Sequence, residues 1–146
     1  MMEMTVANFK WHVAEISKRF QIPVILDSER ERHKAIALNA IHRVTKESVG
    51  RVVIAREIDD ETSYAVVMHE FGHHLAPDGF CTKQKPKPGA HPREMFEYRA
   101  AKLVCEEAAW TWARYYIEQV FIWTVAMEQV RYFGINGYTE ARRTGR

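Results

Sequence analysis

Apolar residues recur at helical spacing close to the start of the chain. The stripe consists of Phe9, Val13, Ile16 and Phe20. Residues three and four apart share one face of a helix, and Thr5 precedes the stripe as a possible N-cap, so the pattern predicts a helix over residues 6–20. Pro23 then interrupts the helical pattern, and the apolar run at residues 23–26 predicts a short strand.

Three further apolar runs are typical of strands. They cover residues 35–38, 41–45 and 51–55, and Gly50 stands just before the last of them. A second helical pattern follows. Asp59 and Asp60 have side chains suited to an N-cap, and an apolar-periodic run then predicts a helix over residues 64–75.

The second half of the chain has the pattern of two long helices. Residues 79–92 are rich in Lys, Pro and Gly and predict a solvated loop, and Pro92 suits the first turn of a helix. A single helix from Pro92 to Phe133 would be about 63 Å long, whereas a domain of this size has a diameter of about 40 Å. We therefore predict a break between Tyr115 and Trp123.

The fold class follows from these elements. Gly134 and Gly137 are expected to end the last helix and to leave residues 139–146 as a short basic tail. A length of 146 residues suits a single domain over residues 1–146. We expect an α+β fold, in which a short mixed or antiparallel sheet packs on the helix at residues 64–75 and on the C-terminal helices.

Composition narrows the class of protein. Hydrophobic residues make up 47% and charged residues 27% of the chain, which is ordinary for a globular domain and argues against disorder. No apolar run is long enough to span a membrane, and the first residues lack the pattern of a signal peptide. Cys81 and Cys105 are too few for a disulfide framework, so we expect a cytoplasmic protein with no membrane partner. The unusual feature is seven histidines, three of them at positions 69, 73 and 74.

The histidine cluster contains the HExxH pattern. His69 and His73 lie one helical turn apart on one face, where both imidazoles can bind a single Zn²⁺ ion. Glu70 can then act as general base, because zinc lowers the pKa of the water it coordinates. With this composition the pattern occurs by chance in about 3% of such chains. His74 is rotated about 140° from His69 around the helix, so it cannot bind the same metal.

A catalytic zinc usually has three protein ligands, and the third one is not fixed by this motif. The residues at positions 76 and 79 exclude a third histidine at metzincin spacing, which leaves a carboxylate on the following helix. The candidates are Glu94, Glu97, Glu106 and Glu107.

A helical wheel distinguishes these carboxylates. Glu97 falls on a face of mostly small apolar residues, which would let two helices approach closely. That face comprises Ala101, Val104, Ala108 and Tyr115. Glu106 falls on the most polar sector, where it forms an ordinary pair with Lys102. Glu94 and Glu107 are less favoured. We therefore expect Glu97 as the third ligand, with Glu106 as the alternative.

The order of these segments resembles that of the ImmA/IrrE-type metallopeptidases. The resemblance covers residues 50–115: the strand at Arg51–Ala55, the motif from His69, and a downstream acidic helix. In that family a glutamate of an ExxAN-x-F-A-like helix follows the HExxH motif. Glu97–Val104 has the better spacing and Glu106–Ala113 has the better pattern, although neither contains the asparagine. The resemblance implies zinc-dependent cleavage or control of DNA-binding repressors, often in phages and other mobile elements.

Two function classes remain after this step. The first is a cytoplasmic zinc metallopeptidase acting on a protein or peptide substrate, for which the resemblance implies a DNA-binding regulator. The second is a catalytically inactive zinc-binding module that binds such a regulator. A net charge of +2 and basic residues confined to a loop and the C-terminal tail give little support to a nucleic-acid partner. Neither the substrate nor the oligomeric state is specified by the sequence.

Overall fold

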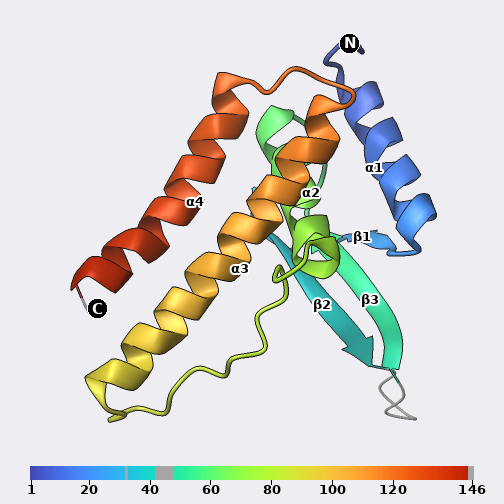
Figure 1. Cartoon of the computed structure of the whole chain (residues 1–146). Helices are drawn as coiled ribbons and strands as arrows, with labels where there is room; N and C mark the ends of the chain where they lie inside the picture. The colour runs from blue at the N-terminus through green and yellow to red at the C-terminus, as the bar shows by residue number, and fades with distance from the viewer. Residues whose placement is uncertain (32, 42–47, 145–146) are drawn as a thin grey trace.

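The computed structural model describes residues 1–31, 33–41 and 48–144. The elements follow in the order α1 (Val6–Phe20), β1 (Val24–Leu26), β2 (Ala35–Ile41), β3 (Ser48–Ala55), α2 (Glu61–Leu75), α3 (Pro92–Glu118) and α4 (Val125–Thr144) (Figure 1). The described part of the chain is therefore a small α+β domain, as expected, with four helices and a three-stranded sheet.

The sheet is mixed and has β3 at its centre. The strand order is β1-β3-β2, with β1 parallel and β2 antiparallel to β3. The apolar run at residues 35–38 continues to Ile41 as one strand, so Ile41 ends this strand, and the rest of the strand expected at residues 41–45 lies outside the described residues. Residues 42–47 lie outside the described ranges. Gly50 lies inside β3 rather than before it. Its φ of 98° beside the register shift at Ala40/Ile41 is a conformation that glycine adopts without strain.

The first helix agrees with its predicted bounds. The Thr5 side chain accepts a hydrogen bond from the backbone N–H of Asn8, which satisfies one free donor of the first turn. Gln21 ends the helix in a left-handed conformation. The predicted stripe faces inward: Phe9, Val13 and Ile16 are buried.

Helix α2 is the centre of the fold. It contacts α1, α3, α4, β2 and β3 (Figure 1). A capping box starts the helix, with Asp60 bonded to the backbone N–H of Ser63 and the Ser63 hydroxyl bonded to the backbone of Asp60. All ten residues from 63 to 72 are buried, so this helix has no solvated face along most of its length. Any polar side chain in that stretch has to find a partner inside the protein.

The long C-terminal pattern is divided where the sequence predicts a break. Helix α3 ends at Glu118, and α4 begins at Val125. The expectation that Gly134 and Gly137 end the second helix is wrong, because α4 continues through both. A glycine costs about 1 kcal/mol inside a helix, which the surrounding residues can offset. The predicted tail at residues 139–146 is correspondingly helical as far as Thr144.

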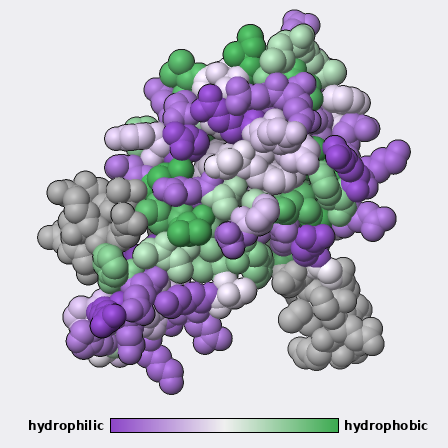
Figure 2. All heavy atoms as spheres, viewed as in Figure 1, coloured by the Kyte–Doolittle hydropathy of each residue, from purple (hydrophilic) through white to green (hydrophobic). Residues whose placement is uncertain are grey.

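The outer surface combines polar and apolar areas. Figure 2 shows apolar side chains that interrupt a largely hydrophilic surface in this view. The exposed apolar residues include Val125 and Phe133 of α4, which are 75% and 70% exposed. None of the described helices has both the length and the apolar character needed to cross a membrane.

A buried polar pair joins α1 to α2. The Tyr64 hydroxyl donates to Nδ1 of His12 over 2.5 Å, and the ring of Tyr64 also stacks on Phe9. Burial lowers the pKa of His12 to about 4 and raises the pKa of Tyr64, so the imidazole is neutral and the phenol keeps its proton. The bond satisfies the Tyr64 hydroxyl and Nδ1 of His12 at a largely buried position.

Acidification should therefore destabilise the protein through His12. Between its folded pKa of about 4 and its unfolded value of 6.5, the unfolded chain binds a proton that the folded protein excludes. The contribution of His12 to stability is intact above pH 6.5 and is lost as the pH falls to 4, a difference of about 3 kcal/mol. Urea unfolding at a series of pH values measures this loss.

The matched control is the double variant His12→Leu/Tyr64→Phe. It removes both hydrogen-bonding groups and leaves neither of them unpaired. Its free energy of unfolding should fall less steeply between pH 6.5 and pH 4 than that of the wild type. Parallel curves for the two proteins would contradict this role of His12.

Candidate metal centre

The three polar residues of the HExxH pattern lie together on α2. Donor atoms of His69, Glu70 and His73 lie within 4.8 Å of one another. His69 and Glu70 are each only 8% exposed. Buried side chains of this type require charged or hydrogen-bonded partners, so they are unusual components of a buried helix unless they bind something.

Glu106 of α3 joins the two histidines. Its Oε2 lies 2.8 Å from Nε2 of His69, and its Oε1 lies 3.1 Å from Nε2 of His73. One carboxylate therefore contacts the same nitrogen of both rings. Two imidazole nitrogens and a carboxylate facing one point are the ligand types that divalent zinc binds, so these residues fit a metal ion.

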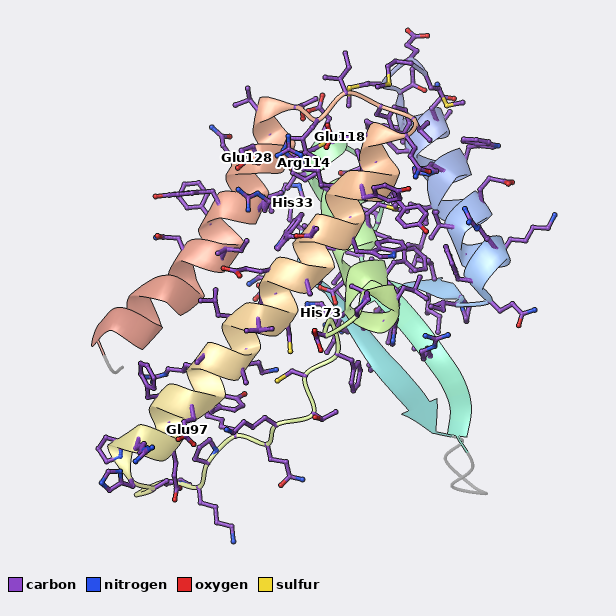
Figure 3. All side chains as sticks on the ribbon, in the orientation of Figure 1. His33, His73, Glu97, Arg114, Glu118 and Glu128 are labelled. Carbon is purple, nitrogen blue, oxygen red and sulfur yellow. The ribbon has the colours of Figure 1, made fainter. Side chains whose placement is uncertain are left out.

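The structure places Glu97 elsewhere, which reverses our preference between the two carboxylates. Glu97 is exposed near the N-terminal end of α3, and Figure 3 shows it well away from His73. Its partners are Arg93, at 3.3 Å, and Lys83, at 3.7 Å. Glu97 precedes Glu106 by nine residues, about 13 Å along a helix, so one of them alone can face the histidines.

The helical wheel failed because it identified the wrong face of α3 as buried. Val104 and Tyr115, on the sector assigned to Glu97, are 53% and 63% exposed. The buried residues are instead Leu103, Cys105, Ala109, Trp110, Ala113 and Ile117. Glu106 lies beside this buried set with a side chain only 14% exposed, and it binds the histidines rather than forming the expected surface pair with Lys102. Glu94 and Glu107 are both exposed.

A close approach of the two backbones brings Glu106 to α2. A Cβ atom added at Gly72 would lie 2.3 Å from the carbonyl oxygen of Ala109. Only glycine fits at this contact, which lies between the two histidines of the motif. Since Ala109 is one helical turn after Glu106, the same contact fixes the position of Glu106 along the α2 axis, next to His69 and His73.

The loop after α2 orients the second histidine. Nδ1 of His73 donates to the carbonyl oxygen of Gly79 over 2.7 Å. That bond turns Nε2 toward Glu106 and leaves it as the nitrogen that a metal ion would bind. Gly79 is itself required here, since a Cβ atom on it would lie 2.4 Å from the carbonyl oxygen of Gly72.

An indole ring supports the first histidine. Trp110 is 3% exposed, and its ring stacks on that of His69 with centroids 4.3 Å apart and planes 17° from parallel. The stack restrains the imidazole to one plane. Trp110 follows Glu106 by one helical turn, so α3 supplies both the carboxylate and the flat surface against which His69 lies.

Glu70 is held from the opposite side by the sheet. Its Oε2 accepts a hydrogen bond from the backbone N–H of Ala37 over 2.9 Å. Among the described strands, β2 pairs only with β3, so its outer edge faces this carboxylate. A pocket of about 300 Å³ lies here between β2, α2 and α3. It is lined in part by Ala35, Ile36, Ala37, Glu70, His73 and Glu106.

The buried charges of the site are mutually stabilising. Burial alone would lower the pKa of His69, but the hydrogen bonds and charges of Glu106 and Glu70 outweigh burial and raise it. Burial would raise the pKa of Glu106, yet its bonds to His69 and His73 lower it. Without metal, His69 is therefore an imidazolium against a carboxylate. A metal ion needs the neutral imidazole, so its binding would release a proton.

His74 serves a different purpose, as its angle around the helix predicts. Its Nε2 donates to the carbonyl oxygen of Val52 over 2.9 Å, which ties α2 to β3. Burial lowers its pKa, so the ring is neutral. A second group of ligand-type side chains, His33, Asp59 and Asp60, lies at the start of α2, where Asp60 is already the N-cap.

Sequence reasoning missed three supporting residues, namely Gly72, Gly79 and Trp110. The types of these residues do not by themselves indicate a metal site. One signal was available for Gly72, because a glycine between two histidines on a buried helix indicates a close neighbour. Nothing in the pattern identifies which ring stacks on which, since that depends on how α3 is rotated.

The chain was compared with protein families, curated proteins and solved structures. No protein-family model, no curated protein and no solved structure matches the chain.

Replacing Gly72 with alanine should force α2 and α3 apart. The added methyl group meets backbone rather than a flexible side chain, so we expect Gly72→Ala to lower the free energy of unfolding by about 1–3 kcal/mol. The control is Gly137→Ala, since a Cβ atom there has no neighbour within 4 Å. That substitution should be neutral or stabilising by up to about 1 kcal/mol. Urea unfolding of both variants measures the difference, and equal effects would refute the close approach.

Proposed function

We propose that this chain is a zinc-dependent metallopeptidase. In this proposal His69, His73 and Glu106 hold the metal, and Glu70 is the general base. The observation that carries it is the convergence of two Nε2 atoms on one buried carboxylate, at 2.8 and 3.1 Å, with a further carboxylate beside them at the wall of a pocket.

Zinc, when bound, supplies a Lewis acid that polarises a peptide carbonyl and activates water. The remaining roles belong to residues of the chain. The Gly79 carbonyl and the Trp110 ring keep the two imidazoles oriented. Glu70 accepts the proton of the attacking water and passes it to the leaving amine, which general-base catalysis requires of a group within hydrogen-bond reach.

The outer edge of β2 supports an extended peptide as substrate. The N–H of Ala37 points to this edge, where Glu70 accepts it, and alternate residues of a strand present their backbone groups to the same edge. A peptide lying along β2 would extend the sheet by one strand and would pass Glu70 and His73. Two of the three β2 residues that line the pocket, Ala35 and Ala37, have small side chains.

The resemblance to ImmA/IrrE-type metallopeptidases refines the proposed substrate. The segment with the better match to that family's helix pattern, Glu106–Ala113, is the one whose first glutamate contacts the histidines. We extend the proposal accordingly to a zincin-like fold and to an intracellular, DNA-binding regulator as the protein that is cleaved.

Metal content should distinguish Glu106 from Glu97. Wild-type protein and Glu97→Gln are expected to bind one zinc ion per chain, whereas His69→Ala and His73→Ala should bind none. Glu106→Gln should weaken affinity by more than about 100-fold, because losing even a hydrogen-bond partner of a ligand costs about 10–100-fold. Elemental analysis and competition with a chelator provide the measurement. Equal affinity in Glu106→Gln and Glu97→Gln would exclude Glu106 as a ligand.

Replacing Glu70 should greatly slow hydrolysis without removing the metal. Glu70→Gln is expected to keep zinc and to hydrolyse unfolded protein substrates about 10²–10⁴-fold more slowly, since it lacks the proton acceptor. Glu97→Gln serves again as control, with activity unchanged. If the wild type binds zinc yet cleaves no substrate from a broad set of peptides, the alternative of an inactive zinc-binding module is favoured instead.

A further inference from the structure

Two thiols line the pocket of the candidate metal centre. Cys81 belongs to the loop between α2 and α3, and Cys105 belongs to α3. Both line the same pocket of about 300 Å³ as Glu70, His73 and Glu106. Neither is needed by the proposed hydrolysis, so the presence of the pair requires a separate explanation.

The two cysteines flank the groups that position His73. Cys81 follows Gly79 by two residues, and the Gly79 carbonyl holds Nδ1 of His73. Cys105 directly precedes Glu106, whose carboxylate contacts Nε2 of the same ring. A bond between the two sulfur atoms would therefore join the two segments that hold His73 from its opposite nitrogens.

Position and exposure suit a disulfide between them. Both thiols are free and line the same pocket, where burial and the neighbouring Cys81 thiol raise the pKa of Cys105. Cys81 is partly exposed and lies in coil, whereas Cys105 is 7% exposed and lies within a helix. The pair is thus accessible on one side.

We propose that Cys81 and Cys105 form a reversible disulfide in response to peroxides, and that this bond controls exchange of the metal. The Cys81 sulfur attacks one peroxide oxygen, the O–O bond breaks, and water leaves as Cys81 becomes a sulfenic acid. The Cys105 sulfur then attacks the Cys81 sulfur, the S–O bond breaks, and a second water leaves. Two thiols are oxidised and one peroxide is reduced, so atoms and electrons balance.

The disulfide would slow metal release because it restricts the movement of the loop that holds His73. Release of a metal requires His73 or Glu106 to move away, and the loop at Gly79, which holds His73, lacks the backbone hydrogen bonds of a helix or strand. The disulfide fixes this loop to α3. Oxidised protein should therefore release zinc more slowly than reduced protein, a part of the inference that rests on the proposed function.

The test begins with thiols, which can be counted whether or not the protein binds zinc. Full-length protein is treated with one equivalent of hydrogen peroxide, and free thiols are titrated before and after. We expect both thiols to be lost without dimerisation, a peptide map that joins Cys81 to Cys105, and a rise in Tm of at least about 5 °C. Dithiothreitol should restore both thiols. Persisting thiols, disulfide-linked dimers or over-oxidation to sulfinic acid would overturn the proposal.

Variants and metal release complete the test. Cys81→Ser and Cys105→Ala each retain one thiol, so peroxide should raise Tm in neither. In zinc-loaded wild type, oxidation should slow the transfer of zinc to a coloured chelator by about 10-fold or more, and it should leave both variants unchanged. A disulfide that forms without slowing this transfer would refute its control over the metal. A wild type that binds no zinc would refute the proposed function, while the thiol count and Tm still decide whether the disulfide forms.

Discussion

The close approach of α2 and α3 at Gly72 is the constraint on which the candidate site depends. A helix pair normally keeps its axes 8–10 Å apart because side chains separate the backbones. Here a Cβ atom at Gly72 would overlap the Ala109 carbonyl, so the two backbones are in direct contact. Glu106 lies one helical turn before Ala109, so this contact places its carboxylate beside the two histidines. Gly79 packs on the same spot, so the loop that orients His73 depends on the same absence of side chains.

Burial of α2 gives this contact its rigidity. The helix is surrounded by α1, α3, α4 and the sheet, so it cannot shift without disturbing the entire core. The same burial makes each polar residue on it dependent on a partner. His69 and His73 bind Glu106, Glu70 binds the β2 backbone, and His74 binds the β3 backbone. These polar residues thereby tie α2 to α3 and to two strands of the sheet.

The sequence predicted features that depend on neighbouring residues and missed those that depend on distant ones. The bounds of α1, the break before α4 and the pairing of His69 with His73 follow from local periodicity, caps and helix geometry. The choice between Glu97 and Glu106 depends on which face of α3 is inward. That helix has apolar residues on several faces, so composition alone could not decide its rotation; contact with Gly72 does. The course of β3 through Gly50 likewise depends on its pairing with β2.

The charges of the site indicate how folding and metal binding are related. A lone buried carboxylate would cost several kcal/mol, and removing a metal from such a site often unfolds a small domain. In this chain Glu106 keeps two imidazole partners without metal, since its pKa is lowered and that of His69 is raised by their contact. The positive charge of protonated His69 thus balances the Glu106 carboxylate, as a bound cation would. The domain can accordingly fold without metal, and a metal ion that bound here would displace a proton from a site whose geometry α2, α3 and the Gly79 loop already determine.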